Sequence, residues 1–111
     1  MINLIQDRAT KEQLEEMLEI LSSYIKLPVD IERGILAGGG ELHADCEAVL
    51  IENGSKQVDI WGADWYPLTQ EVGYESLINI RPRQNNRSME IQDPMIRQQV
   101  AHIVQQLLGG L

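Results

Sequence analysis

The sequence predicts an α+β domain in which helices near both ends of the chain pack on one face of a mainly antiparallel sheet of three or four strands. Apolar residues recur at helical spacing near the two ends, and the middle of the chain alternates polar and apolar side chains. Within that middle part, Asn53-Gly54 is a strong signal for a tight hairpin turn. The 111 residues fit a single two-layer domain spanning residues 1–111, and the free face of its sheet is expected to meet water or a partner.

Two helices are predicted in the first third of the chain. Thr10 followed by Gln13 has the form of a capping box, and apolar residues then recur every three or four positions as far as Ile25. Pro28 disfavours helical geometry in the residue before it, so the first helix is expected to end or kink there. A second, short helix is expected over residues 31–36, stopped by the glycines that follow.

A final helix is predicted to begin at Pro94. Asp93 supplies an N-cap, and proline suits the first helical turn because its missing N–H would have no partner there. The apolar side chains of this segment form one stripe before Gly109, made of Ile96, Val100, Ile103, Val104, Leu107 and Leu108. This stripe is expected to face the sheet.

Three strands are expected between these helices, over residues 42–51, 58–66 and 76–81. Pro82 ends the third, because a proline cannot continue a central ladder. Residues 2–5 form either a short opening strand or an apolar leader packed on a helix.

The length of the hairpin loop decides which side chains share a face. A two-residue loop places His43 opposite Asp64 and Cys46 opposite Trp61, and it points both tryptophans into the core. A three-residue loop moves Trp61 and Trp65 to the polar side of the sheet instead. The first register is favoured because it hides the large apolar area of the tryptophans.

Composition and charge exclude several classes of protein. The chain has 17 acidic and 9 basic residues and a net charge of -8, which argues against general binding of nucleic acid or anionic membranes. No stretch approaches the roughly 18 apolar residues of a membrane span, and the first ten residues lack the features of a signal peptide. The single cysteine, Cys46, has no partner for an internal disulfide. A cytoplasmic location and no cofactor are therefore expected.

The candidate binding residues are polar side chains expected on the open face of the sheet and in the loop after it. Alternation places His43, Asp45 and Glu47 together on the first hairpin strand. Arginine forks, amides and hydroxyls suit the recognition of phosphate or carboxylate groups, and the only concentrated positive charge lies at residues 81–88. The remaining candidates are Asn79, Arg81, Arg83, Asn86, Arg87 and Ser88. The plain structural alternative is that these acids and arginines pair with one another across the sheet.

No metal site is assigned from the sequence. Alternate residues on a strand lie about 6.6 Å apart, so His43, Asp45 and Glu47 are unable to reach one ion together. Two of them could bind a metal if the fold supplied a third ligand, for which Asp64, Glu90 and His102 are the candidates. Cys46 is expected on the core side as a packing residue.

Several motifs occur together in the order of a known family: G-G-E-L-H-A-D (39–45), Trp61-Gly62, Tyr66-Pro67, S-L-I-N-I-R-P (76–82) and N-R-S-M-E-I-Q-D-P (86–94). With these motifs the chain resembles a family of short bacterial proteins, many of them cyanobacterial, known as domain of unknown function 5674. A serine and a glycine are commoner in that family where this chain has Arg83 and Asn85, so the loop is more basic here. The resemblance implies no reaction. It implies that His43, Asp45, Arg81, Asn86, Arg87 and Ser88 belong to the family's own motifs.

Three functions fit these residues, and whether the protein is an enzyme stays open. The first is a non-catalytic binding domain, expected as a homodimer, that engages an anionic small molecule or a protein partner. The second is a metal-dependent phosphoesterase or nuclease with His43 and Asp45 as ligands, Glu47 as base and Arg81 or Arg87 on the phosphate. The third is a protein that docks the acidic first helix, through Glu15 and Glu19, on a basic target.

Overall fold

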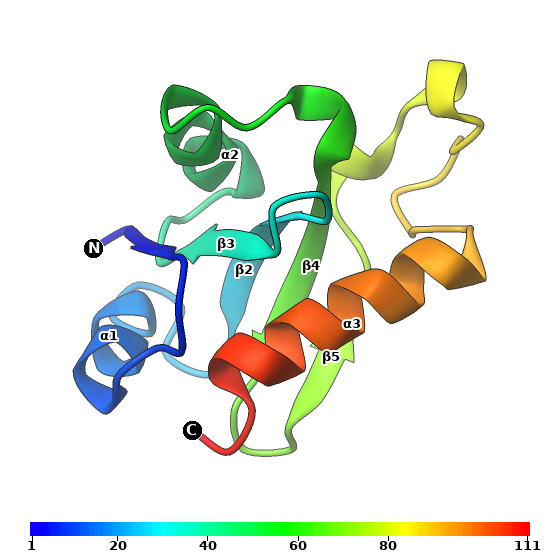
Figure 1. Cartoon of the computed structure of the whole chain (residues 1–111). Helices are drawn as coiled ribbons and strands as arrows, with labels where there is room; N and C mark the ends of the chain where they lie inside the picture. The colour runs from blue at the N-terminus through cyan, green and yellow to red at the C-terminus, as the bar shows by residue number, and fades with distance from the viewer.

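The computed structural model describes the whole chain, residues 1–111, and centres on one five-stranded antiparallel sheet (Figure 1). The strands run across the sheet in the order β1, β3, β2, β4, β5. Their bounds are β1 Asn3–Ile5, β2 Ile25–Asp30, β3 Ile35–Gly38, β4 Ile60–Tyr66 and β5 Glu71–Gly73. The expected α+β class is confirmed, with one strand more than the three or four expected, and residues 3–5 are a strand.

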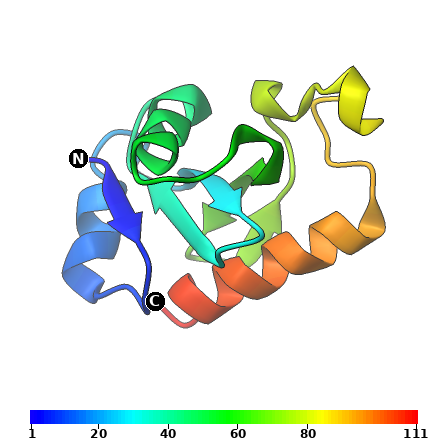
Figure 2. The same ribbon diagram turned by 45° about the horizontal axis from the view of Figure 1, so that its top comes forward.

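Helices cover both faces of this sheet. The N-terminal helix α1 (Lys11–Met17) and the C-terminal helix α3 (Pro94–Leu108) pack on one face, as expected, over the larger hydrophobic core. Helix α2 (His43–Glu52) lies on the opposite face over a smaller core, so α2 and α3 flank the sheet in Figure 2. The sheet face that the sequence left open is therefore partly covered by α2. None of the helices is long and apolar enough to cross a membrane.

The two terminal helices begin where their capping residues predict. Thr10 Oγ1 accepts the Gln13 N–H at 3.1 Å, and Gln13 Oε1 accepts the Thr10 N–H at 2.9 Å. Asp93 Oδ1 accepts the Met95 N–H at 2.8 Å at the start of α3. Helix α1 ends at Met17, however, well before the expected Ile25. Ile25 instead opens β2, a strand at the centre of the sheet.

The predicted helix over residues 31–36 is wrong, because this segment forms the β2–β3 hairpin. Asp30 Oδ1 accepts the N–H groups of Glu32 and Arg33, both at 3.0 Å, which closes the turn. Pro28 lies inside central strand β2, opposite Gly62 of β4. Gly62 directs its N–H and its carbonyl away from β2, to the side chain of Asn79. On the other edge of β2, β3 pairs only from Val29 onward. The missing N–H of Pro28 therefore breaks no ladder bond.

The predicted strand over residues 42–51 is also wrong, because these residues form α2. Its buried face is His43, Cys46, Glu47 and Leu50, at the i, i+3, i+4, i+7 spacing of a helix. Asn53-Gly54 ends this helix, and Gly54 has the positive φ of 105° common just after a helix. The hairpin register consequently does not exist, although both tryptophans do lie in the main core, and Cys46 packs in the smaller one.

The predicted strand over residues 76–81 is replaced by a short 3₁₀ turn, Leu77–Asn79. The reason lies in Asn79, whose side chain pairs with the backbone of Gly62 as a strand would. Its Oδ1 accepts the Gly62 N–H at 2.7 Å and its Nδ2 donates to the Gly62 carbonyl at 3.0 Å. One buried amide thus occupies the edge of β4 beyond the end of β5.

Candidate functional site

Helix α2 separates the three polar residues that were expected on one strand face. His43 and Glu47 lie one turn apart on its buried side, whereas Asp45 is exposed. At 3.6 residues per turn, Asp45 lies about 200° around the helix from His43. The two therefore do not converge as metal ligands, and nowhere in the chain do three His, Cys, Asp or Glu side chains gather to hold a metal ion.

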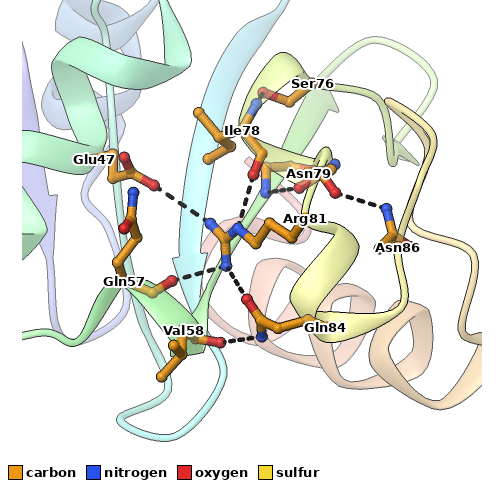
Figure 3. Close-up of polar contacts among 10 residues, drawn as sticks. Glu47, Gln57, Val58, Ser76, Ile78, Asn79, Arg81, Gln84 and Asn86 are labelled. Carbon is orange, nitrogen blue, oxygen red and sulfur yellow. Dashed lines mark hydrogen bonds and ion pairs between the residues drawn. The ribbon is translucent and has the colours of Figure 1, made fainter.

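The guanidinium of Arg81 makes four hydrogen bonds with acceptors inside the protein (Figure 3). Its Nε donates to the Ile78 carbonyl at 2.9 Å, and Nη1 donates to the Gln57 carbonyl at 2.8 Å. Nη2 lies 3.4 Å from Glu47 Oε2, and the two side chains are each 11% exposed. Burial lowers the pKa of Arg81, and the charge of Glu47 raises it in part. The arginine–acid pairing weighed as the plain structural alternative is the one observed, through a helix instead of a strand.

The asparagines of the expected binding loop are also structural. Besides Gly62, Asn79 Nδ2 donates to the carbonyls of Tyr74 and Met89. Asn86 Nδ2 donates to Asn79, Ser88 and Glu90 carbonyls at 2.7 to 3.0 Å. Both side chains are buried, and they hold residues 74–92 against the sheet.

The other three loop candidates lie nearer the surface. Arg83 and Arg87 are exposed, and neither side chain forms an ion pair. Ser88 Oγ accepts the Glu90 N–H at 3.1 Å. Arg81 and Arg83 line a second pocket together with Glu47, but Arg87 and the two asparagines do not, so the loop candidates do not all converge on one site.

A cleft of about 450 Å³ lies where the first turn of α2 meets β2, β4 and the loop after β5. This volume is in the range of small-molecule sites, roughly 300–1,000 Å³. Its polar lining comprises Lys26, His43, Asp64, Glu75 and Ser76, and exposed apolar side chains such as Leu42, Leu77 and Met89 border it. His43 is the one predicted site residue that lines this cleft.

His43 contacts β4 through one ring nitrogen and leaves the other without a protein partner. Nε2 donates to the Ala63 carbonyl at 2.7 Å, because a carbonyl oxygen accepts only. Asp64 Oδ1 lies 3.3 Å from the same nitrogen but is buried without a hydrogen bond, since the proton points to Ala63. Nδ1 is neither hydrogen-bonded nor sealed from solvent. The contact of His43 with Asp64 that the hairpin predicted is present, and helix packing produces it.

The amino end of α2 opens on this cleft without a cap. Leu42 occupies the N-cap position and offers no side-chain acceptor, and the N–H groups of His43 and Ala44 have no partner in the chain. Aligned peptide dipoles give a helix end of this kind roughly half a positive charge. Leu42, His43 and Ala44 all line the cleft, so the uncapped end of the helix borders it.

Tyrosines and carboxylates form another part of the lining. Tyr24 and Tyr66 stack with ring centroids 5.4 Å apart and an interplanar angle of 13°. Burial raises the pKa of Tyr66, and the charges of Asp64 and Glu75 are among the further causes that raise it. Negative charge therefore reaches the ring of Tyr66.

Residues 3–107 match the family model described as "Protein of unknown function (DUF5674)". The chain belongs to this family. The match includes every residue of the cleft, and it confirms the family that the sequence motifs indicated. Comparisons with curated proteins and with solved structures found no match.

Sequence reasoning missed most of the cleft of this DUF5674 protein. Lys26 was placed in a helix, and Ser76 in a strand, so neither was expected near His43. Tyr66 is the last residue of the strand predicted over residues 58–66 and was not among the candidate site residues. The signal that could have revealed the site was the helical spacing of His43, Cys46, Glu47 and Leu50, which places His43 in the first turn of a helix that has no capping side chain.

Proposed function

We propose that this DUF5674 protein is a non-catalytic binding domain for small molecules that carry a carboxylate group. The observation that supports it best is the uncapped amino end of α2, which borders the cleft and whose His43 and Ala44 N–H groups have no partner in the chain. Such a helix end binds anions, because backbone donors and the helix dipole act together. The polar lining of the same cleft adds to this field.

Lys26 and Ser76 supply further donors for an anionic group. Lys26 lies on β2 directly opposite Asp64, yet no ion pair within 4.0 Å joins them. Ser76 Oγ accepts the Ile78 N–H at 3.3 Å, which leaves its own proton free to donate. A carboxylate suits the cleft better than a phosphate, because a second negative charge would lie beside Asp64 and Glu75.

The proposal moves the anion from the arginine–asparagine loop to the amino end of α2. Arg81 directs its N–H groups at protein acceptors, and Asn79 and Asn86 are buried and saturated. Binding is favoured over catalysis because no hydrogen bond joins Ser76 to His43, although both line the cleft. The pair therefore lacks the contact of an activated nucleophile.

Calorimetry with isocaproate, a short branched carboxylate, tests this function. Wild type is expected to bind it saturably, and Lys26→Met is expected to weaken binding by about tenfold or more, because a hydrogen bond to a charged group contributes roughly 1.5–3 kcal/mol. Lys56→Met is the matched control, since Lys56 is exposed and lies outside the cleft. Absence of isocaproate binding, or equal binding by the two lysine variants, would overturn the proposal.

A further inference from the structure

The cleft offers acceptors as well as donors. Asp64 is 8% exposed, and its Oδ1 is buried without a hydrogen bond. Glu75 lines the same cleft from the loop after β5, is exposed, and forms no ion pair. A carboxylate-bearing ligand would therefore lie near two acids, neither of which forms an ion pair with a lysine or an arginine.

A positive group on the same ligand would relieve that conflict. An ammonium group would donate hydrogen bonds to the carboxylates, and the stacked rings of Tyr24 and Tyr66 offer faces that attract a cation. Lys26 leaves this place open, since it forms no ion pair with Asp64.

The apolar side chains that border the cleft indicate what kind of side chain a zwitterionic ligand would carry. Leu42, Leu77 and Met89 are 54%, 71% and 38% exposed, and they line the same cleft, so together they form an apolar border. A side chain of similar character on the ligand would cover them. A cleft of about 450 Å³ is suited to a single small molecule.

We infer that the ligand is an α-amino acid with an apolar side chain, and this inference rests on the proposed function. Its carboxylate meets the N–H groups of His43 and Ala44, and its ammonium group meets Asp64 and Glu75. Its side chain lies against Leu42, Leu77 and Met89. A ligand of this kind satisfies the donors, the acceptors and the apolar border of the cleft at once.

Calorimetry with three related probes tests the inference: leucine, isocaproate, which lacks the ammonium group, and isoamylamine, which lacks the carboxylate. Leucine is expected to bind about tenfold or more tightly than either analogue. In Asp64→Asn, leucine is expected to bind no more tightly than isocaproate, and the affinity for isocaproate itself is expected to stay the same or rise, because a like charge beside the carboxylate is lost. Glu71→Gln, an exposed acid on β5 outside the cleft, is the control and is expected to change neither.

The results separate this inference from the function beneath it. Equal affinities for leucine and isocaproate would overturn the amino-acid inference and leave the carboxylate site standing. Absence of isocaproate binding would overturn the proposed function, and the inference with it, because the inference rests on that function. Glu75→Gln provides a second acid variant if Asp64→Asn fails to fold, because Glu75 is exposed and forms no ion pair that the substitution would remove. This variant is also expected to weaken the binding of leucine more than that of isocaproate. Unchanged leucine affinity in Glu75→Gln would then count against the inference.

Discussion

Individual side chains determine which of the expected polar residues are free to bind anything. Arg81, Asn79 and Asn86 have the chemistry of anion recognition, but each donates its hydrogen bonds to acceptors within the protein. His43 has a similar pattern of burial but keeps one ring nitrogen free. Residue type alone does not distinguish these cases, because the distinction depends on where the backbone carbonyls lie.

The internal role of Arg81 leads to a stability prediction. Arg81→Ala is expected to lower the free energy of unfolding by about 3 kcal/mol, because it strands Glu47 as a buried charge and removes the cation over Trp61. Urea denaturation measures the change. Arg83→Ala is the matched control, since Arg83 is exposed and close in sequence, and it is expected to stay within about 0.5 kcal/mol. Equal stabilities of the two variants would show that Arg81 is not a structural residue.

At the scale of elements, the sequence predicted the starts of α1 and α3 because caps are local. Thr10 with Gln13 and Asp93 with Pro94 need no knowledge of the rest of the chain. The sequence misassigned α2 because its buried face contains a histidine and a glutamate, which interrupt the apolar stripe and leave an accidental alternation. Asn53-Gly54 reinforced the error, since a positive φ serves a helix end as well as a hairpin.

Strands β2 and β3 were missed for a different reason. The sequence assigns Pro28 to the end of the first helix, whereas a proline is accepted inside β2 because β3 pairs with β2 only from Val29 onward and Gly62 directs its backbone groups away from β2. These pairings depend on segments far along the chain. The candidate site inherited both errors, so His43 and its contact with Asp64 were predicted but the remaining lining was not.

Substitutions at the exposed Ala48 distinguish a helix from a strand in residues 43–52. Ala48→Gly is expected to lower the free energy of unfolding by about 1 kcal/mol, and Ala48→Thr by about 0.5 kcal/mol, because both residues have lower helix propensity than alanine. In a strand, threonine would be favoured over alanine. Thermal or urea unfolding of the two variants is the measurement, and a more stable Ala48→Thr protein would contradict the helix.

For the whole molecule, burial of Cys46 in the smaller core makes stability fall at alkaline pH. Burial raises the pKa of the Cys46 thiol, with a smaller contribution from the charge of Asp45. The unfolded chain then loses the thiol proton at lower pH than the folded chain, so stability is complete below the ordinary thiol pKa and falls as the pH rises above about 9. Burial also raises the pKa of Tyr66, which extends the same loss to higher pH.

Cys46→Ala isolates the contribution of the thiol. The free energy of unfolding is measured with urea at about pH 7.5 and about pH 9.5. It is expected to fall less between these two pH values in Cys46→Ala than in wild type. The comparison uses the pH slope, so the small cavity left by alanine does not affect it. Identical slopes in the two proteins would show that Cys46 is not the titrating group.

The most direct test of a binding site at the amino end of α2 is an NMR titration of the backbone amides with isocaproate. The His43 and Ala44 signals, whose N–H groups have no partner in the free protein, are expected to shift most and to reach saturation together. Saturable shifts centred on Arg83 and Arg87, with His43 and Ala44 unmoved, would contradict it.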